Sequence, residues 1–288
     1  LFRSGNRWLL ERAVAQSGGR LTIEGARGRL ADGMTIARLE WRDGDLAVVL
    51  EELSAVARLS FLPLELTVDT LDVGRAHVHQ PAAEGAGDGP LPLAPVLESL
   101  ALPFPVDLRA LTLGPVERSV GAAEPVHLVD LLTAQGRWFR GLDGLRVEAE
   151  GPMFAGGLEG AIDFSAPFAH RLHLELRGAD DAAPSLALDL ESSGSDTVVS
   201  GRLERPRVTV DGRLRGWAEA PRLDLRVEAP RLPVGEGVSL DDLAATLTGT
   251  PEDYRFDGGG QLLLTGRPPS PFAVRGGGTG DGLTVETA

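Results

Sequence analysis

The sequence predicts an all-β protein in which an elongated antiparallel sheet curls into an open groove with an apolar interior, after a short N-terminal helix. Three observations carry this prediction. From residue 20 onward, apolar residues recur at every second position, the period of a strand with one buried and one solvated face. The 37 glycines and 20 prolines supply turn residues between these runs. Strand starts recur about every 12 to 15 residues, a spacing close to that of all-β domains.

The first elements follow from local signals. Residues 1–19 predict a short helix, with Asn6 as a suitable N-cap, helix formers from Arg7 to Ala15, and Gly18-Gly19 as the stop. Residues 20–80 then alternate apolar and polar side chains, as in Leu46-Ala-Val48. This stretch is the predicted first segment of the β groove.

Residues 81–101 interrupt the alternation. Pro81 to Pro95 is rich in Ala, Gly and Pro, which predicts a flexible insertion. Val96 to Leu102 predicts a short helix that Pro103 ends. Because the same alternation resumes afterwards, residues 102–288 are predicted to continue the groove.

The inward positions of the strands are mostly Leu, Val and Ala, and aromatic residues make up only 5% of the chain. An interior of this kind is a smooth aliphatic surface. The candidate residues lining the groove are Leu66, Val68, Leu145, Val147, Ile162, Phe164, Leu172, Leu174, Leu176, Leu186, Leu188, Leu190, Val208, Val210, Leu223, Leu225 and Val227.

Strands with one apolar face can bury it in a sandwich, in a closed barrel, or along an open trough. The smooth aliphatic face favours the trough, as do short serial connections without long crossovers. The length also exceeds one sandwich, and no polar linker follows residue 95. A tandem pair of sandwiches stays open as an alternative.

The composition and the spacing of His and acidic residues argue against catalysis, metal binding and nucleic-acid binding. A net charge of −14 argues against nucleic acid, and the absence of Cys excludes disulfides and thiol nucleophiles. His77 and His79 share a strand face and could hold a metal, but a strand end beside the insertion explains them more simply. His170 and His173 point to opposite faces. The carboxylates occupy outward positions of the strands, where a solvated face explains them. We therefore expect no enzyme activity, no metal and no cofactor.

Targeting signals are not visible. The longest uncharged runs, such as Leu59 to Leu64, fall far short of the roughly 20 apolar residues of a membrane-spanning helix. The chain opens at Leu1 without an initiator Met, and we therefore expect it to be a fragment of a longer protein.

The order of strand motifs is characteristic, and most of it lies between residues 5 and 115. The motifs are Trp8-Leu9-Leu10-Glu11, Gly19-Arg-Leu-Thr-Ile-Glu-Gly25, Gly28-Arg-Leu-Ala-Asp-Gly-Met-Thr-Ile36, Leu39-Glu-Trp41, Leu46-Ala-Val48, Leu71-Asp-Val73, Leu102-Pro-Phe-Pro-Val-Asp-Leu108, Leu111-Thr-Leu113 and Leu158-Glu-Gly160. This order resembles the start of the periplasmic part of the TamB family, the inner-membrane component of the translocation and assembly module.

The resemblance implies a β-taco groove of the AsmA-like, bridge-like lipid-transfer type. It implies a periplasmic location, with an inner-membrane anchor and a C-terminal domain outside this fragment. It also implies partnership with the outer-membrane barrel TamA, through contacts beyond residue 288. The function expected from it is a conduit for phospholipids between the inner and outer membranes. A chaperone-like scaffold for outer-membrane proteins and a structural β-sandwich array are the alternatives.

Overall fold

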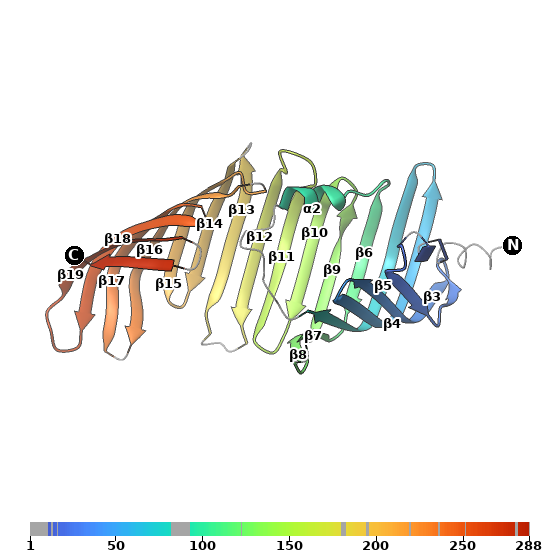
Figure 1. The fold of residues 1–288 in the computed structure, drawn as a ribbon, viewed down its shortest axis with the longest axis horizontal. Helices are drawn as coiled ribbons and strands as arrows, with labels where there is room; N and C mark the ends of the chain where they lie inside the picture. Colours follow the sequence, from blue (N-terminus) through green and yellow to red (C-terminus); the bar gives the residue numbers. More distant parts are fainter. Residues whose placement is uncertain are drawn as a thin grey trace. The chain divides into compact units, whose positions relative to one another are not determined.

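The computed structural model describes residues 11–12, 14–15, 17–81, 93–121, 123–179, 183–193, 196–218, 220–235, 237–250, 252–279 and 282–287. Within these residues the protein is all-β, as predicted, with twenty strands and the short helix α2 (Leu93–Ser99) (Figure 1). The chain divides into two compact units. The N-terminal unit comprises residues 1–87 and 102–157, and the C-terminal unit comprises residues 88–101 and 158–288.

The predicted N-terminal helix is present where the structure describes it. Residues 11–12 and 14–15 are helical, and Gly18 and Gly19 adopt φ angles of 64° and 86°, which end the helix. The Ser17 hydroxyl donates to the Val14 carbonyl at 2.7 Å and accepts from the Leu21 amide at 3.0 Å. The predicted N-cap, Asn6, lies outside the described residues.

The N-terminal unit forms one mixed sheet. In this sheet β3, β4 and β5 pair antiparallel, β5 pairs with both β6 and β7, and β6 leads through β9 to β10. Strand β11 (Phe154–Asp163) contains the division between the units. The strands before it are β1 (Leu21–Glu24), β2 (Arg27–Arg29), β3 (Gly33–Asp43), β4 (Leu46–Phe61), β5 (Leu64–Gln80), β6 (Val106–Leu113), β7 (Val116–Val120), β8 (Val126–Val129), β9 (Leu131–Trp138) and β10 (Gly141–Glu150).

The pairing of β5 with β6 and β7 is parallel, which corrects the prediction of a purely antiparallel sheet with only short connections. A parallel pair needs a crossover of a dozen or more residues. The segment between Gln80 and Val106 supplies it, so the interruption read as an insertion is the crossover connection. Its helix, α2, begins three residues before the predicted position and ends at Ser99.

A line of register shifts crosses this sheet. They lie between Val56 and Ala57 in the β4–β5 pair, between Leu108 and Leu111 in β6–β9, and between Asp143 and Arg146 in β10–β9. Bulges of this kind bend a sheet and increase its twist. They also change which sequence positions face inward, so that Leu108 and Leu111 lie on the same face.

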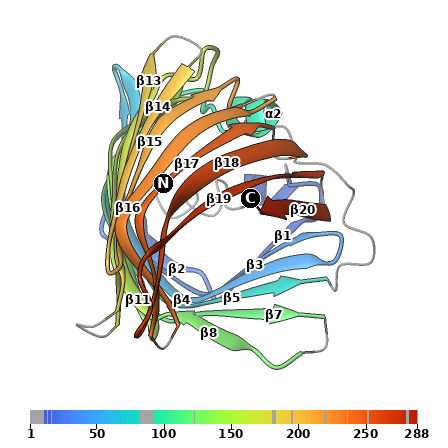
Figure 2. The ribbon, with the colours of Figure 1, turned by 90° about the vertical axis from the view of Figure 1, so that its left-hand side faces the viewer.

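The C-terminal unit is an antiparallel meander in which each strand pairs with the next (Figure 1). Its later strands, β16 to β19, are strongly curved in Figure 2. Among the described residues no pairing joins β12 to β20, so this sheet is open. Its strands are β12 (His170–Gly178), β13 (Ser185–Ser193), β14 (Asp196–Glu204), β15 (Arg207–Arg215), β16 (Arg222–Gly235), β17 (Val238–Gly249), β18 (Asp253–Leu264), β19 (Ser270–Thr279) and β20 (Gly282–Thr287).

The helices offer no membrane span. Among the described residues, none is both long enough and apolar enough to cross a bilayer.

Candidate functional site

The register of the C-terminal unit aligns the candidate lining residues into rows that cross the sheet. Leu174 pairs with Leu188, and Leu188 pairs with Gly201 on the next strand. The same relation continues strand by strand. The complete central row is Leu174, Leu188, Gly201, Val210, Val227, Ala245, Gly258 and Val274.

Parallel rows flank the central row on the same face, because side chains two positions apart on a strand point the same way. One flanking row is Leu172, Leu190, Val199, Gly212, Leu225, Leu247, Phe256 and Gly276. A shorter one is Leu176, Leu186, Leu203 and Val208, and Leu223 lies in a fourth with Leu214, Gly249 and Tyr254.

Most of these aliphatic residues are only half-buried. Every residue of the central row is of intermediate exposure, and Val199 is the buried member of the first flanking row. Among the described residues of this unit, the main contacts between elements join neighbouring strands, and no second layer of strands or helices packs over the rows. Gly258 on β18 and Gly276 on β19 have no side chains, so nothing projects from the apolar face at these two positions. The rows therefore form an apolar face that remains partly accessible. Of the other two candidates in this unit, Ile162 is half-buried and Phe164 is 2% exposed.

The opposite face of the same strands is polar. His173 pairs with Asp189, and its ring lies 2.7 Å from the Asp189 carboxylate and 3.3 Å from that of Glu175. These two hydrogen bonds, Asp189 first, raise the pKa of His173. His170 lies on the apolar side, as the three-residue spacing predicted. The polar row continues through Ser200, Asp211, Arg226, Thr246, Asp257 and Arg275.

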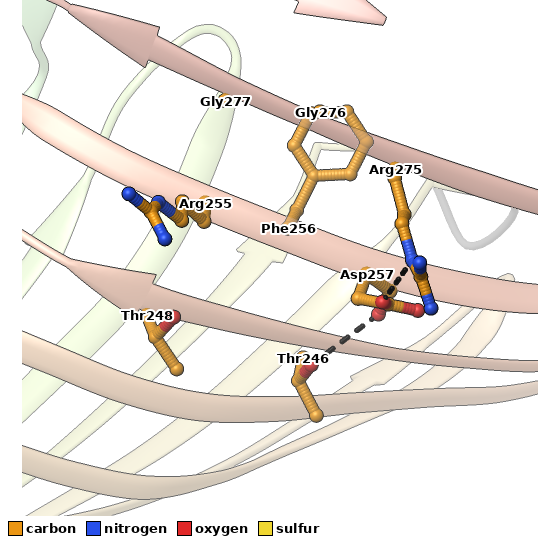
Figure 3. A pocket seen from close by; sticks show the side chains of 8 residues that line it. All are labelled: Thr246, Thr248, Arg255, Phe256, Asp257, Arg275, Gly276 and Gly277. Carbon is orange, nitrogen blue, oxygen red and sulfur yellow. Dashed lines mark hydrogen bonds and ion pairs between the residues drawn. The ribbon is translucent and has the colours of Figure 1, made fainter. Parts of the chain in front are cut away.

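The polar face also carries a shallow depression of about 490 Å³ over β17, β18 and β19 (Figure 3). Arg275 donates to the Asp257 carboxylate at 2.6 Å, and the Thr246 hydroxyl donates to the Asp257 carbonyl at 3.3 Å. Arg255 and Thr248 also line it. Phe256, Gly276 and Gly277 complete its lining, so the depression combines polar and apolar groups.

An aromatic cluster that sequence reasoning missed lies at one end of the apolar face. The Trp217 ring packs edge-on against Phe168 and His170, at centroid distances of 6.3 and 4.7 Å. Thr197 hydrogen-bonds Nε2 of His170 at 3.1 Å, and the Phe168 carbonyl lies 2.9 Å from Nδ1. Helix α2 joins this end through a bond from the Ala94 amide to the Ala218 carbonyl. The only sequence signal was the local concentration of aromatic residues in an aromatic-poor chain.

In the N-terminal unit the four candidate residues Leu66, Val68, Leu145 and Val147 are half-buried. They lie in different rows of the sheet, because Leu66 continues to Val106 and Trp138 whereas Val147 continues to Ala134 and Leu111. Leu145 lies in the register shift between β10 and β9. This unit also has a buried core, which sequence reasoning did not distinguish from a lining. The core is Ile36, Leu53 and Val73, with Ile23, Met34, Leu39, Leu50 and Leu113 packed around it.

The pair His77 and His79 lies on one face, as the strand spacing predicted. Their rings contact the buried Ser119 hydroxyl at 3.0 and 2.9 Å, and Glu117 lies 3.7 Å from His77. The parallel pairing of β5 with β7 places these four residues together. Within the described residues, no three or more His, Asp or Glu side chains form a group suited to a metal ion. The Ser119 hydroxyl hydrogen-bonds one nitrogen of each ring, so the cluster ties β5 to β7.

Comparisons with protein-family models, with curated proteins and with solved structures found no match. The features that bear on function are therefore the geometry of the apolar face and the sequence motifs.

Proposed function

We propose that this chain is a non-enzymatic lipid-transfer conduit that carries phospholipids along the apolar face of its curled sheet. The observation that carries the proposal is the set of half-buried aliphatic rows that cross β12 to β19, over which no second layer packs in the part of the unit that the structure describes. A soluble protein that keeps an apolar surface of this extent accessible normally has a ligand or partner for it.

The dimensions suit an acyl chain. Strands lie about 4.8 Å apart, so the eight strands of the central row extend over roughly 35 Å. One leaflet of hydrocarbon in a bilayer is about 15 Å thick. The row is therefore longer than one acyl chain, and a tail can slide along it without leaving apolar contact.

The energetic role is to cover the tail while the headgroup stays in water. Each CH₂ exposed to water costs about 0.8 kcal/mol, and a continuous aliphatic lining removes this cost at each position along the route. No chemical step and no cofactor is needed. The polar face of the same strands keeps the protein solvated from outside.

The biological setting of the proposal comes from the TamB resemblance. It comprises a periplasmic location with an inner-membrane anchor, transfer between inner and outer membranes, and TamA as partner outside this chain. These parts of the proposal rest on the strand motifs between residues 5 and 115 and can fail while the conduit itself stands.

The experiment compares two neighbouring residues that face opposite ways. Leu188 lies in the central apolar row, whereas Ala187 pairs with Glu175 and Arg202 on the polar face. Leu188→Glu is expected to abolish co-purified phospholipid in native mass spectrometry and to stop transfer of a fluorescent phospholipid between vesicles. Ala187→Glu adds the same charge and is expected to retain both. Leu174→Glu, on the residue opposite Leu188, should repeat the loss.

Two results would reject the conduit. One is a wild-type chain that neither carries nor transfers phospholipid. The other is a Leu188→Glu variant that transfers lipid as fast as Ala187→Glu does.

A second candidate function, a scaffold for unfolded outer-membrane proteins, is favoured by the edge at β20. This strand pairs with β19 along one side, and among the described residues no strand pairs along the other. Such an edge can accept an extended peptide as an additional strand. Native mass spectrometry that finds bound peptide and no phospholipid would support this function instead.

A further inference from the structure

The turn between β4 and β5 projects apolar side chains into solvent. Phe61 is 75% exposed and Leu62 is 95% exposed, and Leu59 and Leu64 beside them are also exposed. Apolar residues scattered singly over a surface need no explanation, but a contiguous group of four at one turn marks an interaction site.

The register brings further aromatic residues to the same edge of the sheet. Leu66 pairs with Val106, and Val106 pairs with Trp138. Phe104 lies two residues before Val106, and Phe139 directly follows Trp138; both side chains are half-buried. The Leu102 amide donates to the Phe139 carbonyl at 2.8 Å. Figure 1 shows the β4–β5 turn and the end of β9 at the same edge.

The charges of this edge differ from those of the whole chain, which carries −14. The Arg140 guanidinium lies 5.3 Å from the Phe139 ring centroid and has no carboxylate partner among the described residues. Arg137 pairs with Glu65 at 3.4 Å, and Arg58 and Arg109 share Asp69. Glu65, Asp69 and Asp107 are each paired with an arginine, which lowers their repulsion from an anionic surface.

We propose that this aromatic edge, defined as Phe61, Leu62, Leu64, Phe104, Phe139 and Arg140, docks on the surface of a phospholipid bilayer. Phe61 and Leu62 enter the acyl region, and Arg140 meets the lipid phosphates. A projecting turn suits insertion into a fluid layer, and aromatic rings with arginine at their side are the residues of a membrane interface.

The conformation of the β4–β5 turn is also restricted before binding. The ring of Pro63 fixes its own φ angle, and both flanking strands are paired up to Phe61 and Leu64. Little conformational freedom is therefore lost when the turn enters the bilayer. This proposal does not depend on lipid transfer: the edge can dock on a membrane whether or not the apolar rows carry lipid.

The first test measures binding of the whole chain to vesicles by co-flotation, using phosphatidylethanolamine with phosphatidylglycerol. The double variant Phe61→Asp/Leu62→Asp is expected to bind at least tenfold more weakly. Met153→Asp is the matched control, because Met153 is 80% exposed on the β10–β11 turn of the same unit. It is expected to bind as the wild type does, and Arg140→Glu is expected to lose part of the binding at low salt.

The second test uses the absence of cysteine from the chain. Leu62→Cys and Met153→Cys each create a single site for an environment-sensitive fluorophore. The fluorophore at position 62 is expected to shift to the blue and brighten when vesicles are added, and the one at position 153 is not. Both positions are exposed, so neither substitution disturbs the core.

Three results would overturn the proposal. The wild type does not bind vesicles, or Phe61→Asp/Leu62→Asp binds as well as Met153→Asp does, or position 62 stays in water in the presence of vesicles. Light scattering distinguishes a self-association surface: a wild-type dimer that the double variant makes monomeric, without vesicle binding, would assign the edge to a second copy of this chain.

Discussion

The two units of this protein use the same strand pattern and reach different results. In the N-terminal unit, long bent strands and a branched, partly parallel sheet bury Ile36, Leu53 and Val73 in a core. In the C-terminal unit, a regular meander leaves its aliphatic rows half-exposed, and burial concentrates around Phe168, His170 and Thr197 at one end.

The difference shows that alternation specifies a one-sided sheet but not what covers its apolar side. Bulges bend β4 and β5, and such bending brings apolar residues of a single sheet closer together. A regular antiparallel sheet of similar composition keeps its rows accessible. Stability is therefore expected to come mainly from the core of the N-terminal unit and the aromatic cluster of the C-terminal unit. Ligand contact is expected along the rows.

The largest expected effect is on the stability of the N-terminal core, compared with that of an apolar row. Leu53→Glu places an uncompensated charge in the core, where Leu53 is 7% exposed, and is expected to cost about 3–5 kcal/mol or to prevent folding of the unit. Leu188→Glu, on a half-buried row, is expected to cost about 1 kcal/mol because its carboxylate can reach water. Urea unfolding followed by circular dichroism measures both, and equal losses would contradict the contrast.

A substitution at Phe164 distinguishes a core residue from a lipid-contacting residue. Sequence reasoning placed it among the lipid contacts, and the structure leaves it 2% exposed. Phe164→Ala is expected to destabilise the chain by about 3–5 kcal/mol through the cavity it leaves. The fraction of the remaining folded protein that carries phospholipid is expected to stay unchanged. Calorimetry measures the loss of stability, and native mass spectrometry of the same preparation measures the bound phospholipid. An unchanged melting temperature would contradict the expected destabilisation.

Thr197 tests the aromatic cluster. Its hydroxyl hydrogen-bonds Nε2 of the buried His170, and Val has nearly the same shape without that group. Thr197→Val is expected to cost about 1–3 kcal/mol because it leaves a buried polar atom unpaired. Thr246→Val, on the exposed polar face of β17, is the control and is expected to change stability little. Similar values for both variants would show that the cluster does not stabilise this end.

The smallest expected effect belongs to the polar face. Asp189 and Glu175 raise the pKa of His173, so its contribution to stability is present below the unfolded pKa and is lost as the pH rises through the folded value. His173→Gln is therefore expected to lower the melting temperature slightly near about pH 6 and not near about pH 9. The side chain is exposed, so the difference is small. A difference that grows with pH would contradict this sign.

Particular residues show how far sequence reasoning reached. It predicted the helix stop at Gly18-Gly19, the shared face of His77 and His79 and the opposite faces of His170 and His173, because each depends on local spacing alone. The shift from Val68 to Leu71 was a visible sign of a bulge, since two apolar residues three apart cannot share the face of a regular strand. The parallel pairing of β5 left no such sign, because it depends on where the chain returns after residue 80.

The sequence by itself determined an all-β chain with one aliphatic and one charged face, because alternation is a property of each strand alone. Only the tertiary structure decided which aliphatic residues are buried. Leu53 and Leu188 are the same residue type in the same kind of strand, and they differ because bends and partner strands surround one and leave the other half-open. Pairing over long sequence separations made that difference, since burial depends on neighbours and not on the residue type itself.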